Sequence, residues 1–208
     1  MPHMLSTENC RGRTWATDYP LAWLTDAARL KPLATRSHGG RMLKDPFDIA
    51  IYMRLFWEAD PRTVIEIGSS IGASAVWFSD LVPEATVYSV DIAPPADSLP
   101  RIKFLRGDGR KLSQVFSADF LAKLPRPLLV IEDADHSEET TAAVLDFFAP
   151  VLVPGEFIVV EDTLYWPGAL VAVQKFLEAH AEFVIDERYC DMYGYNLTWN
   201  CNGWLRKI

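Results

Sequence analysis

The sequence predicts a single-domain α/β protein with a mostly parallel sheet, helices on both faces of that sheet, and an antiparallel ending. Three observations lead to this prediction. Short apolar runs without polar alternation indicate strands buried on both faces, as in a parallel sheet covered by helices. Helical patterns separate these runs along the chain. With 208 residues, half of them hydrophobic, the chain can bury one substantial core. The runs are TVIEI, TVYSV, IKFL, PLLVI and FIVV.

The first elements precede the sheet. Residues 1–44 are interpreted as an N-terminal lid or assembly segment, because the stretch from Thr14 to Lys44 is irregular, with a helix-like LAWLTDAARL and a turn at 37–40. Residues 45–208 form the α/β domain. This domain opens with a helix in DPFDIAIYMRLFWEAD, whose apolar residues repeat about every 3.6 positions, and Pro61 follows the end of that helix.

The remaining helices alternate with the five strands. They are predicted in GASAVWFSDL, in a short stretch near LSQVFSADFLAKL, in SEETTAAVLDFFAPVL and in ALVAVQKFLEAH. The strand-like EFVIDER follows the last helix. Residues 195–207 are expected to form a hairpin with EFVID, which adds antiparallel strands to the sheet.

Composition and charge argue against several functions. A net charge of −8 disfavours DNA or RNA, whose binding needs Lys and Arg concentrated on one surface. No stretch approaches the roughly 18–20 apolar residues of a membrane span, and the first thirteen residues lack the apolar core of a signal peptide. We therefore expect a cytoplasmic protein with neither nucleic-acid nor membrane partners. Cys10, Cys190 and Cys201 form no CxxC pair and are expected to be ordinary thiols.

The turn after the first strand is a candidate ligand site, because backbone amides and a helix N-terminus face the carboxyl end of the sheet there. Its sequence, EIGSSIG, breaks the nicotinamide fingerprint at Ser70. The pattern E-x-G-x-x-x-G is commoner in class I methyltransferases, where Glu66 can favour the cationic end of S-adenosylmethionine and Gly68 permits close approach. The turn alone leaves this donor, a dinucleotide or a structural turn open. The candidate contacts are Glu66, Gly68, Ser69, Ser70, Gly72 and Ser74.

Two further strand ends supply candidate contacts to an adenosine. Asp91, followed by Ile92, lies just past the second strand, where a carboxylate can accept hydrogen bonds from both ribose hydroxyls of NAD or of adenosylmethionine. Gly107 and Asp108 follow the third strand, where the carboxylate can accept from an adenine amino group. A helix cap is the alternative role of Asp108.

Acidic residues follow the fourth and fifth strands: Glu132, Asp133 and Asp135, with His136 beside them, and then Glu161 and Asp162. The ends of neighbouring parallel strands lie about 4.8 Å apart, so these acids should converge. Strand alternation puts Asp133 and Asp135 on one side and Glu132 on the other. Converging carboxylates need a counter-charge such as Mg²⁺. The alternative is that the acids cap the following helices or lie in solvent.

A divalent ion here would lie beside the donor site, so Asp133 is a candidate contact of both donor and ion. The ion could chelate an acceptor with neighbouring oxygens and lower the pKa of its hydroxyl. The base that takes the proton is His136, or whichever of Asp133 and Asp135 is not a ligand. His136 could instead cap the helix that begins at Ser137.

Seven motifs occur in order from about Lys44 to the C-terminus: KDPFDIAIY, PRTVIEIGSSIGASAVWFSDL, DADHS, VPGEFIVVEDT, WPGALVAVQKFL, FVIDE and NGWLRK. In this order they resemble the cephalosporin hydroxylase family, which includes rhamnosyl O-methyltransferases. The resemblance implies a Rossmann-like class I methyltransferase fold over residues 45–208. It also implies a metal-dependent O-methyltransferase that uses S-adenosylmethionine, acts on a hydroxyl of a sugar or secondary metabolite in natural-product biosynthesis, and forms a homo-oligomer.

The resemblance assigns roles to individual residues. Glu66, Gly68 and Gly72 match the donor loop, Asp91 matches the ribose-binding acid, and Glu161 and Asp162 match paired metal ligands. The third ligand is Asp133 or Asp135, and the base is Asp135 or His136. Two departures from the family pattern are Ser69-Ser70, which makes the donor loop less glycine-rich, and Glu156, which replaces a glycine before the fifth strand.

Two other functions remain open at this stage. One is an adenosyl- or nicotinamide-binding component of a hydroxylase system, and the other is a catalytically degenerate methyltransferase-like subunit that binds a partner. The chain has no recognisable 2-His-1-carboxylate set, so iron-dependent hydroxylation is not expected. Five aromatic residues could line an acceptor pocket or pack in the core: Tyr165, Trp166, Tyr193, Tyr195 and Trp199.

Overall fold

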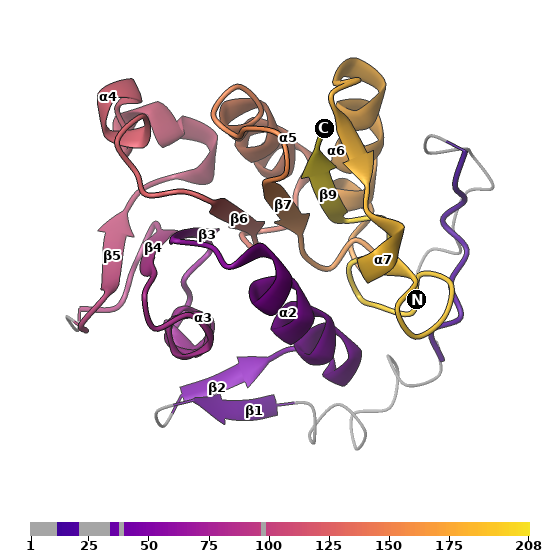
Figure 1. The fold of residues 1–208 in the computed structure, drawn as a ribbon, viewed down its shortest axis with the longest axis horizontal. Coiled ribbons are helices and arrows are strands. Elements are labelled where there is room, and N and C mark those ends of the chain that lie inside the picture. Colours follow the sequence, from indigo (N-terminus) through magenta and orange to yellow (C-terminus); the bar gives the residue numbers. More distant parts are fainter. Residues whose placement is uncertain (1–11, 21–33, 38–39, 97–98) are drawn as a thin grey trace.

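The computed structural model describes residues 12–20, 34–37, 40–96 and 99–208. Its centre is a seven-stranded sheet in the order β5-β4-β3-β6-β7-β9-β8 (Figure 1). The strands in that order are β5 (Ile102–Arg106), β4 (Thr86–Asp91), β3 (Thr63–Ile67), β6 (Leu128–Glu132), β7 (Phe157–Val160), β9 (Trp204–Lys207) and β8 (Phe183–Ile185). The first five pair in parallel, and β9 is antiparallel to both of its neighbours. The predicted fold class is therefore confirmed, including the antiparallel C-terminal strand.

The two faces of the sheet form two cores, because successive residues of a strand point to opposite faces. Ile65 and Val130 pack on one face with α5 (Glu138–Phe148) and α6 (Pro167–Ala179). Val64 and Ile131 pack on the other with α2 (Pro46–Ala59) and α3 (Ala73–Leu81). Figure 1 shows these helix pairs on opposite sides of the strands. All five residues of β3 and of β6 are buried, which explains the absence of polar alternation in the sequence.

The C-terminal part differs from the predicted hairpin. β9 does pair antiparallel with β8, as expected, but it also pairs with β7 and lies between the two. The short helix α7 (Glu187–Cys190) and an irregular stretch separate β8 from β9, so residues 195–203 are not a strand. The predicted helix near 112–124 divides into the 3₁₀ helix η2 (Gly109–Gln114) and the short helix α4 (Ala118–Leu121). Cys190 and Cys201 are free buried thiols, as predicted.

The N-terminal region is only partly described. The helix-like LAWLTDAARL lies outside the described residues. A short antiparallel hairpin, β1 (Ala34–Ser37) with β2 (Gly40–Leu43), stands where the sequence was interpreted as irregular. Trp15 and Tyr19 are buried in the core, and none of the described helices is long and apolar enough to cross a membrane. The lid or assembly role of residues 1–44 stays a prediction.

Candidate active site

The turn after β3 is built around Gly68, whose φ is 111°. Its amide donates to the Val90 carbonyl over 2.7 Å, and the Asp133 amide donates to the Ile67 carbonyl over 2.8 Å. A Cβ on Gly68 would lie 1.9 Å from the Asp133 carbonyl oxygen. Only glycine combines this φ with so close an approach of two backbones. The loops after β3 and β6 are therefore held directly against each other.

A cleft of about 270 Å³ opens over this turn, at the carboxyl ends of the strands. The predicted residues that line it are Gly68, Ser70, Asp91, Ile92, Gly107, Asp108, Asp133 and Asp135. The Asp91 carboxylate accepts from the Ser70 amide at 2.9 Å and from the Ala93 amide at 2.8 Å. These bonds fix the carboxylate at the cleft wall, where each oxygen keeps a lone pair for a further donor.

Glu66 lies beneath the turn and is not among the residues that line the cleft. Its side chain is buried and accepts hydrogen bonds from the hydroxyls of Ser74 and Ser89. Ser89 also shares a 2.6 Å hydrogen bond with Ser69. Burial raises the pKa of Glu66 to about 7, although the two serine hydroxyls oppose the shift. Glu66, Ser69 and Ser74 thus form a network that ties the turn to β4 and α3.

Asp108 adopts the capping geometry that the sequence left as one of two roles. It is the N-cap of η2 and accepts from the Arg110 amide at 3.0 Å. Both carboxylate oxygens also accept hydrogen bonds from the Arg110 guanidinium, at 2.9 and 3.0 Å. Since Asp108 and Arg110 both line the cleft, this pair forms its wall on the side of β5.

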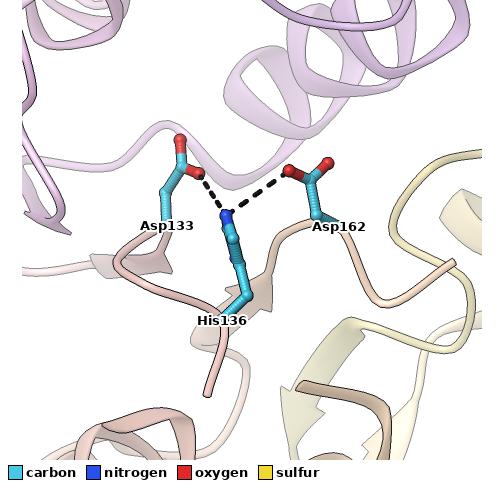
Figure 2. A group of neighbouring side chains, drawn as sticks. All are labelled: Asp133, His136 and Asp162. Atoms are coloured by element: carbon cyan, nitrogen blue, oxygen red, sulfur yellow. Dashed lines mark ion pairs between the residues drawn. The ribbon is translucent and has the colours of Figure 1, made fainter. Parts of the chain in front are cut away.

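Three side chains from the loops after β6 and β7 converge beside the cleft (Figure 2). Asp133, His136 and Asp162 each offer a ligand atom, and these atoms lie within 4.8 Å of one another. The His136 Nε2 is 3.5 Å from an Asp162 oxygen and 3.9 Å from Asp133 Oδ1. The predicted convergence of acids from the fourth and fifth strands is confirmed for Asp133 and Asp162. Burial raises the pKa of Asp162, and the Asp133 and Glu161 charges raise it further.

Asp162 and His136 are fixed by their backbones. Both have positive φ, 60° and 54°, the left-handed backbone conformation that non-glycine residues adopt mostly in turns. The Asp162 amide donates to Asn200 Oδ1 at 2.9 Å, and Asn200 is completely buried. Asn200 was not among the predicted site residues, because it lies in a C-terminal loop whose path the sequence pattern does not reveal.

Two predicted residues lie outside this group of three. Asp135 is exposed and accepts from the amide and the hydroxyl of Ser137, the residue before α5. Asp135 lines the cleft together with Asp133, but it lies outside the group of three, because β6 ends at Glu132 and the chain turns there. Burial opposes the shift, but the Ser137 hydrogen bonds prevail and lower the pKa of Asp135. Glu132 lies on the opposite side, as expected, against Thr141 of α5.

Glu161 is the second residue outside the group, and its partners were not predicted. Its side chain is 2% exposed. One oxygen accepts from the Tyr52 hydroxyl, and the other lies 2.9 Å from Lys44 Nζ. Lys44 Nζ also donates to Asp133 Oδ2 at 2.7 Å. Burial raises the pKa of Glu161, although Lys44 opposes the shift.

The candidate acceptor aromatics divide into two sets. Trp166 stacks on the His136 imidazole, with ring centroids 5.9 Å apart and planes 13° apart, and Tyr165 packs edge-on against Trp166. Both aromatic residues are nearly half exposed. Trp199 is buried in the core instead, and Tyr195 lies under the Arg13 guanidinium. Tyr165 and Trp166 are therefore the two of these residues placed beside the candidate site.

The chain is similar in sequence to known O-methyltransferases. The rhamnosyl O-methyltransferase of Mycobacterium leprae (strain TN) is 31% identical over 137 residues, which cover 60% of this chain and 58% of that protein. The rhamnosyl O-methyltransferase of Mycobacterium bovis (strain BCG / Pasteur 1173P2) is 28% identical over 130 residues, which cover 58% of this chain and 53% of that protein. The matched part thus spans little more than half the length of these relatives.

Solved structures give the same result for the fold. A structure of CmcI with Mg and SAM superposes with a TM-score of 0.70 at 25% identity, over 100% of this chain and 90% of that one. A putative caffeoyl-CoA O-methyltransferase from Staphylococcus aureus shares the fold, with a TM-score of 0.53 at 12% identity. The superposition covers 80% of this chain and 86% of that one. A family model described as Rhamnosyl O-methyltransferase/CmcI matches residues 34–208. The chain has the class I methyltransferase fold and belongs to the Rhamnosyl O-methyltransferase/CmcI family.

Proposed function

We propose that the protein transfers a methyl group from S-adenosylmethionine to a hydroxyl of a sugar or secondary metabolite, with the help of Mg²⁺ or another divalent cation. The observation that carries this proposal is the position of Asp133. This residue lines the cleft over the glycine turn and also belongs to the Asp133–His136–Asp162 group. A donor in the cleft and an acceptor at the group would therefore be neighbours. Family membership and the solved CmcI complex with Mg and SAM support the choice of ligands.

The cleft suits the adenosyl donor. The Asp91 carboxylate, fixed by two backbone amides, can accept from the ribose hydroxyls. Gly68 lets the donor approach the main chain, and Asp133 gives the nearby wall a negative charge that favours a sulfonium and an ammonium. Glu66 does not contact the donor in this proposal. Its carboxylate accepts hydrogen bonds from Ser74 and Ser89 and so supports the turn beneath the cleft.

Asp133, His136 and Asp162 fit a divalent cation by two criteria. Their ligand atoms lie within 4.8 Å of one another, and carboxylate oxygens are the ligands that Mg²⁺ prefers. Burial and the charges of Asp133 and Glu161 raise the pKa of Asp162, and a bound cation would offset both effects. We assign Asp133 and Asp162 as the residues that would hold the ion. The nearby negative charge of Glu161 would add to the attraction for the cation. When bound, such an ion would position the acceptor oxygen and lower the pKa of its hydroxyl.

We assign His136 as the base that takes the hydroxyl proton. Its Nε2 faces the same point as the two carboxylates, and the Trp166 ring holds the imidazole plane. Asp135 is less suited, because hydrogen bonds from Ser137 stabilise its charged form and so make it a weaker base. In the transfer, the acceptor oxygen bonds to the methyl carbon, the carbon–sulfur bond breaks, and the proton goes to His136 Nε2. The products are the methyl ether and S-adenosylhomocysteine.

Calorimetry with adenosylmethionine, adenosylhomocysteine and NADH tests the donor assignment. We expect both adenosyl ligands to bind and NADH not to bind, whereas binding of NADH alone would favour a nicotinamide-dependent component. Methyl transfer to a panel of glycosides and hydroxylated metabolites, with and without EDTA, then tests the metal. Asp162→Ala should abolish metal-stimulated turnover and largely retain donor binding, and equal loss of both would contradict this division of the site. The homo-oligomer stays a prediction that light scattering can check.

A further inference from the structure

The most unusual charged group near the site is a buried lysine on the chain segment that enters α2. Lys44 follows β2 directly, and its side chain is 4% exposed. The Nζ atom lies 2.7 Å from Asp133 Oδ2 and 2.9 Å from Glu161 Oε2. Among the described residues, no other Lys or Arg makes an ion pair with either acid. Two acids, one from each of two strand ends, therefore share one internal cation.

Lys44 stays charged in this position. Two carboxylate oxygens lie within ion-pair distance of the ammonium group and favour its charged form. An ammonium group has three donors, and two of them are directed to these carboxylates. Removing one partner of a buried ion pair usually leaves an uncompensated charge at large cost, so the carboxylates depend on this lysine when no other cation is present.

The contacts of Lys44 also divide the acids into two groups. Asp133 uses Oδ2 for Lys44 and Oδ1 toward His136, and Figure 2 shows one oxygen near the imidazole and the other directed away from it. Glu161 has one oxygen on Lys44 and the other on Tyr52, and it does not belong to the group of three. Lys44 thus leaves Asp133 Oδ1 available to an ion, while both Glu161 oxygens already have a partner.

The backbone holds Lys44 where it is. The next residue, Asp45, is the N-cap of α2 and accepts from the Phe47 amide at 2.8 Å. Tyr19 donates its hydroxyl to the other Asp45 oxygen at 2.5 Å. Because the residue after Lys44 is anchored and the Lys44 side chain itself is buried, the ammonium group stays close to Asp133, and a divalent ion bound there would be repelled across a short distance.

We propose that Lys44 is an internal counter-cation that assembles the acidic site before the metal binds and that sets the affinity for the metal below what the acids alone would give. This inference rests on the proposed metal role of Asp133 and Asp162. Lys44 is a positioning residue in this account, since it acts through Asp133 and Glu161 and not on the substrate. A site of this kind is ordered without metal and exchanges its metal readily.

The test compares Mn²⁺ binding to the wild type and to Lys44→Met, Lys44→Gln and Lys44→Arg, by calorimetry and by electron paramagnetic resonance. We expect the Met and Gln variants to bind Mn²⁺ roughly tenfold more tightly or better, which corresponds to about 1.4 kcal/mol. The Arg variant, which keeps the charge, should stay close to the wild type. In EDTA, the Met and Gln variants should melt at lower temperature than the wild type, and Mn²⁺ should raise their melting temperature by more.

The outcomes separate this inference from the proposed function. Asp162→Ala in each background should remove the Mn²⁺ signal, which shows that the measured site is this one. A wild type that binds no Mn²⁺ would overturn the metal role and this inference with it. Wild-type binding with equal or weaker affinity in the Met and Gln variants would overturn this inference alone. A Met variant that folds only with Mn²⁺ supports the proposal, and one that Mn²⁺ does not rescue contradicts it.

Discussion

The buried carboxyl group of Glu66 should make the stability of this protein depend on pH. Glu66 is completely buried, and its pKa is raised by burial from 4.5 to about 7 in the folded state. The folded protein therefore holds this proton more tightly than the unfolded chain does. The stabilisation is fully present below about pH 4.5 and is lost as the pH rises through about 7. The gap between the two pKa values corresponds to about 3 kcal/mol of unfolding free energy.

Glu66→Gln removes this titration and keeps a side chain of similar shape. The amide oxygen can still accept from one of Ser74 and Ser89, and the other hydroxyl can rotate to accept from the amide nitrogen. We expect the variant and the wild type to have similar stability near pH 4.5. Above pH 7 the variant should be the more stable of the two by about 3 kcal/mol. Glu132 has its pKa raised in the same way, but it is present in both proteins and cancels in the comparison.

The assay is urea unfolding in EDTA, followed by tryptophan fluorescence at steps from about pH 4 to about pH 8. The difference between the two stability curves is the quantity of interest. Glu84→Gln is a matched control, because Glu84 is exposed and its replacement should leave the curve parallel to that of the wild type. A Glu66→Gln curve that also runs parallel to the wild type would refute the argument, since it would mean that folding does not raise the pKa of Glu66.

Three further changes address the site. His136→Asn should lower turnover by roughly 10²–10⁴ and leave Mn²⁺ affinity within a few-fold; a comparable loss of affinity would make His136 a ligand instead. Gly68→Ala should weaken binding of both donor and Mn²⁺ and destabilise the fold by more than the about 1–3 kcal/mol of backbone strain, because its Cβ meets the Asp133 carbonyl. Gly155→Ala is its control, with a similar φ of 93° and nothing within 4 Å, and should show strain alone. Asp91→Asn should weaken adenosylmethionine binding roughly tenfold or more with the melting temperature nearly unchanged, and unaltered calorimetric affinity would remove Asp91 from the ribose site.

Local patterns were sufficient to predict the central strands and the position of the cleft. A strand buried on both faces is apolar throughout, which is why TVIEI and PLLVI identify β3 and β6. Asp133 and Asp162 converge because β6 and β7 are neighbouring parallel strands whose carboxyl ends lie side by side. This convergence could be predicted because the two strands also follow each other along the chain. The antiparallel ending was predictable in kind, but the insertion of β9 between β7 and β8 was not.

The unpredicted part of the site depends on contacts between distant segments. Lys44 and Asp133 are 89 residues apart, and nothing in KDPFD signals that the lysine is buried. Asn200 reaches Asp162 from a loop without a regular pattern. Asp135 shows a different limit, because strand alternation was applied past Glu132, where β6 ends. The hairpin of β1 and β2 has only four residues in each strand, too few for a period to be recognised.

The three engagements of Asp133 have a thermodynamic consequence. Its carbonyl backs the glycine turn, one carboxylate oxygen contacts Lys44, and the other faces His136. Because the proposed donor and the proposed ion would both contact this one residue, occupancy of the cleft and occupancy of the acidic group would be linked. Linkage of this kind is reciprocal: the factor by which the donor tightens the ion equals the factor by which the ion tightens the donor. Under the proposed function, loss of either ligand would therefore change the affinity for the other by this same factor.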